Sequence, residues 1–438
     1  MPSSINDAVA QAPGAAPAAD AGASASPTPA TKLKQPPAVW AVLAASVVAF
    51  MGIGLVDPIL PVIGQGLNAS HAQIELLFTS YFLIIGVSNL LTGWVSSRIG
   101  AKSTLLVGLA LVVVFSALAG QANSVGEVVA YRAGWGLGIA LFISTSMAVI
   151  MSHAAGGPQR AVTLFESALG IGIASGPLLG SLLGNESWRA PFFGVAVLMA
   201  IAFAVVATSV PRTPKPTVAE RTRLSEPLRA LSHKGLALGS VVALLWNFGF
   251  FTMLAYTPLL IGLGVYELGA IFFAWGVLVA IAAVYLAPWL LARYNPTTLL
   301  AVVLVIIVGL LLIIGAAHDT TAIIVPTIIV SGLPLGVGNS LLSNLLFGVS
   351  HTDPADAAAA TNFIRFTGGA IAPFLAGVLS ENVSAAAPLF VAAAVVAVGF
   401  VVLVAGRRLL VAAEAPGSVS SKLTEGDQGK AERELAAA

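Results

Sequence analysis

Twelve long apolar stretches leave this sequence few ways to fold. A helix needs about 20 apolar residues to cross roughly 30 Å of hydrocarbon. Stretches of about this length lie at 39–63, 76–96, 103–122, 128–151, 161–184, 190–210, 236–262, 268–291, 298–317, 321–348, 357–380 and 386–406. Only 9% of the 438 residues are charged and 58% are hydrophobic. Soluble proteins have roughly 25% charged residues, so this chain cannot cover a water-facing surface. We predict an all-α membrane protein with twelve transmembrane helices.

The predicted helices divide into two sets of six. The only long charged segment between them, PRTPKPTVAERTRLSEPLRALSHKG, separates the sixth helix from the seventh. Two sequence matches share nearly one offset: SGPLLGSLL (175–183) with IAPFLAGVL (371–379), and GWVSSRIGAK (93–102) with PWLLARYNPT (288–297). We therefore predict two pseudo-symmetric six-helix bundles at 37–211 and 236–408, arranged as parallel repeats. A cytoplasmic linker at 212–235 and disordered cytoplasmic tails at 1–36 and 409–438 complete the predicted organisation.

Lysine and arginine are distributed unevenly between the two sides of the predicted bundle. Basic residues favour cytoplasmic loops, which sets the orientation of a membrane protein. With a cytoplasmic N-terminus, the inner side contains Arg98, Lys102, Arg160, Arg212, Lys215, Arg221, Arg223, Arg229, Lys234 and Arg293. The outer side contains only Arg189. We therefore predict that both termini are cytoplasmic.

Two motifs lie in the second and fourth predicted helices. The stretch GWVSSRIGAKSTL has the spacing G-x-L-a-D-r-x-G-r-k, with Gly93, Arg98, Gly100 and Lys102 matching and Ser97 in place of the aspartate. The stretch RAGWG has the pattern R-x-x-Q-G, with Arg132 and Gly136 matching and Trp135 in place of the glutamine.

Two further motifs lie in the fifth and first predicted helices. The fifth keeps Gly172, Gly176, Pro177 and Gly180 of the pattern G-x-x-x-G-P-x-x-G-G, with Ser181 in place of the last glycine. The first contains GLVDPILP, around Asp57, Pro58 and Pro61. On these four motifs, residues 39–406 resemble the major facilitator superfamily and, within it, the twelve-helix drug:proton antiporters. The resemblance implies the fold and an efflux function, since the helix-5 motif is associated with antiporters.

The glycines of the fifth predicted helix recur every four residues and form one stripe. In lipid, small residues let helix backbones approach and so become the association surface. Pro177 frees a backbone carbonyl and allows a bend. We interpret the stripe as a close contact on which the two halves rock. Static packing is the alternative.

Four ionisable residues lie inside the predicted spans: Asp57, Arg132, Glu166 and Arg365. Such residues are costly in a membrane and indicate function. From a rise of 1.5 Å per residue, Asp57 and Arg132 share a depth in the outer half, and Glu166 lies too near the cytoplasm to reach Arg132. The five histidines fall in loops or at span ends. Proton coupling is therefore assigned to Asp57, Arg132 and Glu166, with Asp57 or Glu166 as the carrier.

Each of these assignments has an alternative. Asp57 and Arg132 could form a permanent pair that holds two helices together, and Glu166 could extend to water at the membrane surface. Arg365 could bind an anionic group or cap buried carbonyls.

Aromatic and amide side chains predict the wall of a substrate cavity. An apolar cavity with a few polar groups suits lipophilic ligands of varied shape. The predicted cavity residues are Trp246, Asn247, Phe250, Phe251, Tyr256, Trp275, Asn339, Asn362 and Arg365. We predict an antiporter of the plasma membrane that exports lipophilic or amphiphilic compounds in exchange for protons.

A proton-coupled exporter of one metabolite or sugar is the nearest alternative, and a non-transporting membrane sensor is a further one. No catalytic constellation is present, and without cysteine the chain has no disulfide or thiolate metal site. We expect a monomer that is not an enzyme and has no cofactor, metal or nucleic-acid partner.

Overall fold

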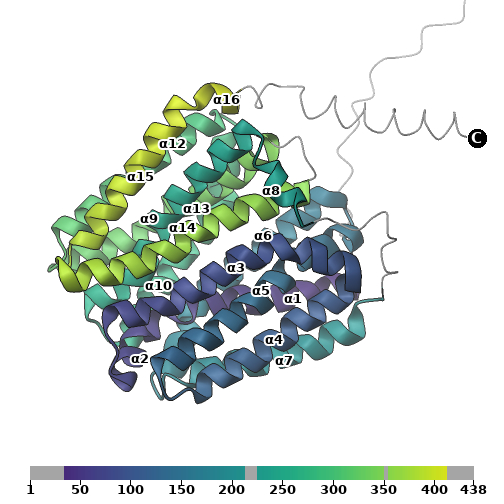
Figure 1. The fold of residues 1–438 in the computed structure, drawn as a ribbon, viewed down its shortest axis with the longest axis horizontal. Helices are drawn as coiled ribbons and strands as arrows, with labels where there is room; N and C mark the ends of the chain where they lie inside the picture. The colour runs from purple at the N-terminus through teal and green to yellow at the C-terminus, as the bar shows by residue number, and fades with distance from the viewer. Residues whose placement is uncertain (1–33, 213–223, 350–353, 412–438) are drawn as a thin grey trace, which may run out of the picture. The chain divides into compact units, whose positions relative to one another are not determined.

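The computed structural model of the protein describes residues 34–212, 224–349 and 354–411, and helices form nearly all of these residues. Figure 1 shows the helices packed side by side. The N-terminal half contains α1 (Pro37–Gly54), η1 (Asp57–Ile59), α2 (Leu60–Leu67), α3 (His71–Ile99), α4 (Ala101–Gln121), α5 (Val125–His153), α6 (Gly157–Gly184) and α7 (Ala190–Ser209). The short helix α8 (Glu226–Ala230) precedes the C-terminal half. That half contains α9 (Lys234–Ile261), α10 (Val265–Ile281), the π-helical turn η3 (Ala282–Leu286), α11 (Ala287–Leu291), α12 (Pro296–Ala316), α13 (Thr321–Val349), α14 (Pro354–Asn382), α15 (Ala387–Ala405) and α16 (Arg407–Val411).

Twelve segments of the described chain are long and apolar enough to cross a membrane, as predicted. Several begin with proline in their first turn, as α7, α12 and α15 do, where the missing N–H has no intrahelical partner to lose. Gly100 separates α3 from α4 with a φ of 86°, a conformation that favours glycine.

The predicted spans differ from the observed helices at two places that matter for function. The first span is interrupted, because α1 ends at Gly54 and the chain passes through the short turn η1 before α2 begins. The second span begins at His71 and not at residue 76, so it includes Glu75, just after its first turn. A capping box stabilises this turn: Ser70 Oγ accepts from Gln73 N (3.3 Å), and Gln73 Oε1 accepts from Ser70 N (3.0 Å).

The two halves repeat each other in side-chain detail. Arg98 donates to the carbonyl of Trp94 (3.0 Å) and lies 3.9 Å from the centre of its ring. Arg293 likewise donates to the carbonyl of Trp289 (3.3 Å) and lies 4.1 Å from the centre of its ring. Trp289 and Arg293 each lie 195 positions after Trp94 and Arg98. The predicted duplication is therefore visible in local geometry.

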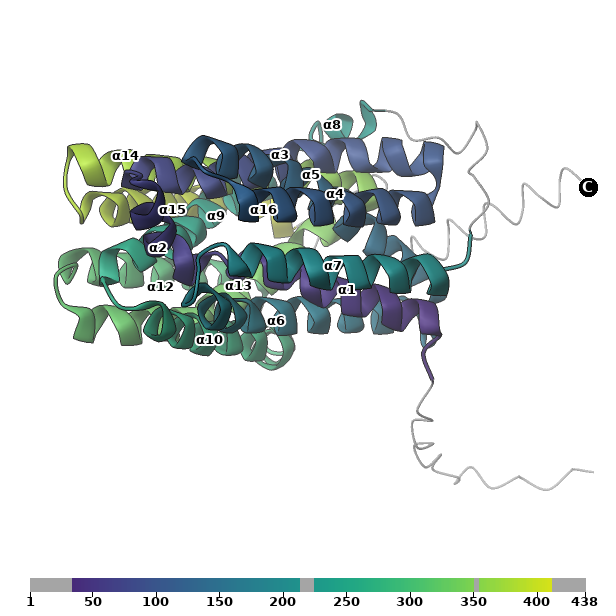
Figure 2. The same ribbon diagram turned by 90° about the horizontal axis from the view of Figure 1, so that it is seen from below.

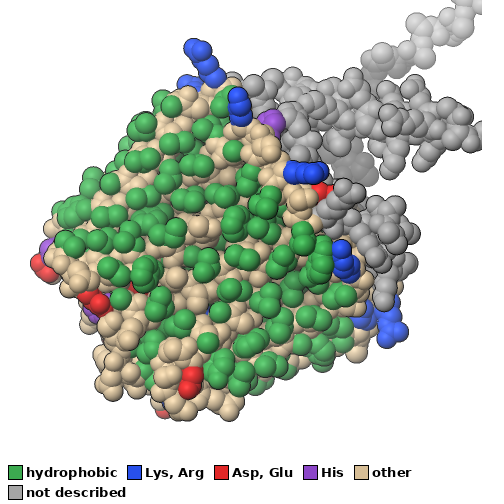
Figure 3. Space-filling model, in the orientation of Figure 1, with side chains coloured by type: hydrophobic (Ala, Val, Ile, Leu, Met, Phe, Trp, Pro, Cys, Tyr) green, Lys and Arg blue, Asp and Glu red, His purple; other side chains and the backbone are tan. Residues whose placement is uncertain are grey.

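Successive spans alternate in direction, so the fold has two ends (Figure 2). We call the end at which α1, α6, α9 and α14 begin the linker end, and the end at which α3 and α10 begin the far end. The exposed surface between them is rich in large apolar side chains. Figure 3 shows lysine and arginine gathered toward the linker end and most of the visible acidic side chains toward the far end.

The halves meet along α3 with α14 and along α6 with α10. At the far end, Glu381 Oε1 accepts from the backbone N–H of Ala72 (2.8 Å). Nearer the middle, Thr79 Oγ1 donates to the carbonyl of Ala370 (2.9 Å). At mid-depth, a Cβ added at Gly86 would lie 3.3 Å from the carbonyl oxygen of Phe363. The two halves are thus closed on each other over the far half of their length.

Candidate functional site

Asp57 lies at the interruption of the first span. Pro58 and Pro61 lack an N–H, so neither can bond to the carbonyl four residues earlier, and these two missing bonds within one turn weaken the α-helix here. Discontinuous helices of this kind form binding sites in transporters. The Asp57 side chain is fully buried, and neither carboxyl oxygen has a hydrogen-bond partner.

Arg132, in α5, lies near Asp57 and interacts with it electrostatically, as the sequence predicted. The guanidinium carbon lies 4.0 Å from the centre of the Tyr81 ring and 4.8 Å from that of Trp135. Two glycines allow this arrangement. A Cβ at Gly136 would lie 2.7 Å from the carbonyl oxygen of Tyr81, and one at Gly52 would lie 2.8 Å from the Trp135 ring.

Glu75 is a third buried ionisable residue at this place, and the sequence interpretation missed it. Its side chain is fully buried, interacts electrostatically with Asp57, and has no hydrogen-bond partner for either carboxyl oxygen. The predicted second span began one residue too late to include it. The capping box at Ser70 was the available signal, because it marks the start of the helix upstream of Glu75. We call Asp57, Glu75 and Arg132 the acid–base cluster.

A second polar group surrounds Arg365 in the C-terminal half. Its Nε donates to Asn247 Oδ1 (3.2 Å), and its Nη2 donates to Asn339 Oδ1. Asn247 Nδ2 in turn donates to the carbonyl of Arg365 (3.0 Å). Glu166, from α6 in the other half, is the acidic group that interacts electrostatically with Arg365. The electrostatic partner of Glu166 is therefore Arg365 and not Arg132.

Most of the predicted aromatic residues form one continuous cluster beside Arg365. The ring centres of Trp246 and Phe250 are 5.3 Å apart, those of Phe250 and Phe251 are 4.7 Å apart, and those of Phe250 and Trp275 are 5.9 Å apart. Phe82 of the N-terminal half joins this cluster, 4.0 Å from Phe251 and 5.8 Å from Phe366. The sequence did not single out Phe82 or Phe366, because their role depends on how α3 and α14 are rotated toward each other.

Two other predicted cavity residues, Tyr256 and Asn362, lie outside this aromatic cluster. Tyr256 donates from its hydroxyl to the carbonyl of Ala385 (2.8 Å), in the connection between α14 and α15 at the far end. Asn362 is half-buried in α14, on the turn before Arg365.

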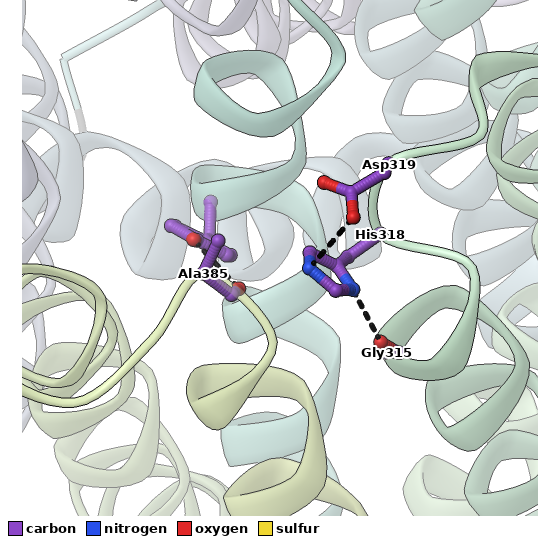
Figure 4. Close-up of polar contacts among 5 residues, drawn as sticks. Gly315, His318, Asp319 and Ala385 are labelled. Carbon is purple, nitrogen blue, oxygen red and sulfur yellow. Dashed lines mark hydrogen bonds and ion pairs between the residues drawn. The ribbon is translucent and has the colours of Figure 1, made fainter.

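Figure 4 shows the far-end region around Ala385, where His318 forms an ion pair with Asp319 (3.2 Å) and contacts the carbonyl of Gly315. His351 lies outside the described residues.

The motif at the end of α3 organises the linker end of the N-terminal half. Lys102 donates to the carbonyls of Ala207 (2.7 Å) and Val210 (2.6 Å) and so caps the C-terminal end of α7. Ser97, which replaces the usual aspartate, donates to the carbonyl of Trp94 in its own helix. Gly93 is exposed, and Gly100 forms the turn to α4.

The glycine stripe of α6 packs against α1, which corrects the interpretation that the two halves rock on it. A Cβ at Gly172 would lie 2.6 Å from the carbonyl oxygen of Val47, and one at Gly176 would lie 2.5 Å from that of Met51. Gly180 approaches the carbonyl of Leu55 in the same way. Both helices belong to the N-terminal half, so the stripe is a contact inside one bundle. Contacts from α6 to the other half use a neighbouring face, where Gly276 of α10 approaches the backbone of Ala174.

Comparison with known proteins defines the family. The sequence profile of the Major Facilitator Superfamily matches residues 42–373, so the chain belongs to this family of membrane transporters and not to an enzyme family. The Multidrug efflux protein YfmO of Bacillus subtilis (strain 168) is 46% identical over 378 residues, which cover 86% of this chain and 95% of that protein. The Tetracenomycin C resistance and export protein of Streptomyces glaucescens is 32% identical over 199 residues, 43% of this chain and 37% of that protein.

Solved structures agree on the fold. The D-xylose-proton symporter matches with a TM-score of 0.70 at 13% identity, over 84% of this chain and 96% of that one. The human organic anion transporter MFSD10 (TETRAN) matches with a TM-score of 0.64 at 17% identity, over 84% of this chain and 99% of that one. The predicted fold class is thus confirmed, and the protein is a twelve-span transporter with multidrug efflux relatives.

The described residues contain no group of three or more histidine, aspartate or glutamate side chains that could hold a metal ion.

Proposed function

We propose that the protein exports lipophilic or amphiphilic, drug-like compounds in exchange for protons, and that the acid–base cluster carries the proton. The observation that carries this proposal is the complete burial of Asp57, Glu75 and Arg132 within electrostatic reach of one another. None of their side-chain polar atoms has a hydrogen-bond partner. Ionisable groups held in this way inside a membrane protein are typical of proton relays.

The charges of the cluster explain why one proton would matter. Two carboxylates and one guanidinium bear a net charge of −1, and one added proton brings the sum to zero. A net charge inside a medium of low dielectric constant is expensive, so the protonation state strongly affects which conformation is stable. Asp57 and Glu75 belong to the first and second spans and Arg132 to α5, so a shift between these helices would bind or release the proton.

Alternating access would use the contact between the halves. The helices are closed on each other over the far half, from Ala72 and Glu381 to Gly86 and Phe363. The basic residues at the linker end support a cytoplasmic location for that end and for both termini. In this orientation the present arrangement is closed toward the outside. We further propose that the protein acts as a monomer in the plasma membrane.

The aromatic cluster supports a drug-like substrate. Flat apolar surfaces bind lipophilic compounds of varied shape, whereas a sugar needs many polar partners. The names of the relatives from B. subtilis and S. glaucescens refer to multidrug efflux and to the export of Tetracenomycin C. The driving force suffices: about 2.3 kcal/mol per charge at 100 mV and about 1.4 kcal/mol per pH unit together support a more than hundredfold gradient of a neutral compound.

Purified protein in liposomes with an imposed pH gradient tests this function. Fluorescent amphiphiles are screened for uptake into acidic vesicles, with empty liposomes as the control. We expect uphill accumulation that a protonophore abolishes. Accumulation of the same size with and without the pH gradient would show a transporter that is not coupled to protons.

A further inference from the structure

Two opposite charges from different halves lie at the same depth of the molecule. Glu166 is the tenth residue of α6 and Arg365 the twelfth of α14, and both helices begin at the linker end. With a rise of 1.5 Å per residue, both side chains start roughly 14–17 Å from that end, near the middle of the fold. Both are half-buried, unlike the acid–base cluster, and interact electrostatically. Within the described part of the chain, no ion pair within 4.0 Å joins them.

Arg365 is held in place without losing its charge. Its two side-chain partners, Asn247 and Asn339, present neutral amide oxygens. Such bonds fix the guanidinium but do not neutralise it, and its five N–H groups exceed the two bonds formed. A planar guanidinium with free donors is well suited to bind a carboxylate through two parallel hydrogen bonds. Asn247 and Asn339 are therefore positioning residues.

An aromatic surface adjoins this charge. The guanidinium carbon of Arg365 lies 5.6 Å from the centre of the Trp246 ring, which stacks on Phe250. Phe250 is half-buried, so part of its ring is exposed next to the tryptophan that contacts Arg365. Aromatic pairs gain from offset and edge-to-face contacts, so another ring would pack well here.

Building on the antiport function proposed above, we propose that the transported compound is an aromatic zwitterion whose carboxylate binds Arg365 and whose ammonium group binds Glu166. Its ring system packs on Phe250, whose ring stacks on the fully buried Trp246. A lipophilic cation would be repelled by Arg365, and a lipophilic anion by Glu166, whereas a zwitterion satisfies both. Because Glu166 and Arg365 belong to different halves, the bound compound bridges the halves and favours their approach.

Four charge forms of one fluorescent compound test this inference. Nε-dansyl-lysine carries an aromatic group, a free amine and a free carboxylate, its methyl ester is a cation, its Nα-acetyl derivative is an anion, and the Nα-acetyl methyl ester is neutral. Affinities are measured on the purified full-length protein in detergent from energy transfer between tryptophan and dansyl. We expect the zwitterion to bind at least tenfold more tightly than the other three.

Variants assign the two charges. Arg365→Gln should reduce the affinities for the zwitterion and the anion at least tenfold. It should leave the affinity for the neutral form unchanged, and this unchanged affinity would show that the variant is folded. Glu166→Gln should lower the affinity for the zwitterion and raise the affinity for the anion. The exposed residues Arg407 and Glu267 supply matched controls, and Arg407→Gln and Glu267→Gln should leave the ranking unchanged.

A zwitterion affinity no higher than that of the neutral form, whether both bind well or neither binds, overturns this inference. So does a ranking that Arg365→Gln and Glu166→Gln leave unchanged. This binding assay is independent of proton coupling. If a pH gradient drives transport but the four charge forms do not show the expected ranking of affinities, only the substrate class is rejected. If the ranking is found but a pH gradient drives no transport, only the antiport mechanism is rejected.

Discussion

At the scale of single residues, Arg132 is stabilised by aromatic rings and not by a hydrogen-bonded carboxylate. Tyr81 and Trp135 place two ring faces within 4.0 and 4.8 Å of its guanidinium carbon. Cation–π contacts of a desolvated cation contribute about 2 kcal/mol or more. Because the rings supply part of the stabilisation, Arg132 does not depend on a hydrogen-bonded carboxylate, which supports the proton exchange proposed for Asp57 and Glu75. The tryptophan at position 135, where the related motif has glutamine, supports this role.

Substitutions of Tyr81 separate its ring from its hydroxyl group. Tyr81→Leu removes the ring and should lower the free energy of unfolding by about 2 kcal/mol. Tyr81→Phe keeps the ring and removes a buried hydroxyl without a hydrogen-bond partner, so it should be neutral or slightly stabilising. Thermal unfolding of the purified variants measures both effects. Equal losses for the two variants would mean that the hydroxyl, and not the ring, supports Arg132.

At the scale of elements, the glycine stripe sets the distance between α1 and α6 and so the position of the break that contains Asp57. The carbonyls that approach the stripe belong to Val47, Met51 and Leu55, the last only two residues before Asp57. A methyl group at these glycines would contact rigid backbone, which has little freedom to move away.

Two glycine variants test the stripe. Gly176→Ala places a Cβ 2.5 Å from the carbonyl oxygen of Met51, so α1 and α6 must separate, and we expect lower thermal stability together with loss of transport. Gly309→Ala in α12 is the matched control, since no atom lies within 4 Å of its added Cβ. It should be neutral or gain up to about 1 kcal/mol from helix propensity. Wild-type stability of Gly176→Ala would contradict the close contact.

The far end of the contact between the halves depends on a carboxylate at a helix N-terminus. Glu381 accepts from Ala72 N in the first turn of α3, where the partial positive charge of the helix favours an anion. Glu381→Ala removes this acceptor and should raise the labelling rate of a cysteine placed at Thr79 several-fold. Glu381→Gln keeps an acceptor oxygen and should raise it less. An unchanged rate in Glu381→Ala would show that other contacts keep this end closed.

The sequence predicted the elements better than the contacts between them. Long apolar runs revealed all twelve spans, because length and hydropathy are local properties. The predicted start of the second span was wrong because His71, Gln73 and Glu75 make the first five residues of α3 polar. The bonds from Arg365 to Asn247 and Asn339, and the contact of Phe82 with Phe251, depend on the rotation of helices about their axes, which hydropathy does not determine.

For the whole molecule, the proposed direction of transport requires the linker end to face the cytoplasm. The native chain has no cysteine, so single cysteines can report sidedness. The exposed residues Arg229, in α8, and Glu186, at the far end, are suitable sites. In intact cells, Glu186→Cys should react with an impermeant maleimide and Arg229→Cys should react only after lysis. The reverse pattern would invert the proposed direction of transport.

The central claim is that the buried acid–base cluster carries the proton. Proton movement driven by a substrate gradient, recorded with a pH-sensitive dye trapped in proteoliposomes, tests it most directly. Asp57→Asn and Glu75→Gln each leave one carboxylate in the cluster with Arg132. The net charge of the cluster is then zero without a bound proton. We predict that both variants still bind substrate but lose proton movement, whereas Glu267→Gln at the surface keeps it. Full proton movement in both cluster variants would show that neither Asp57 nor Glu75 carries the proton.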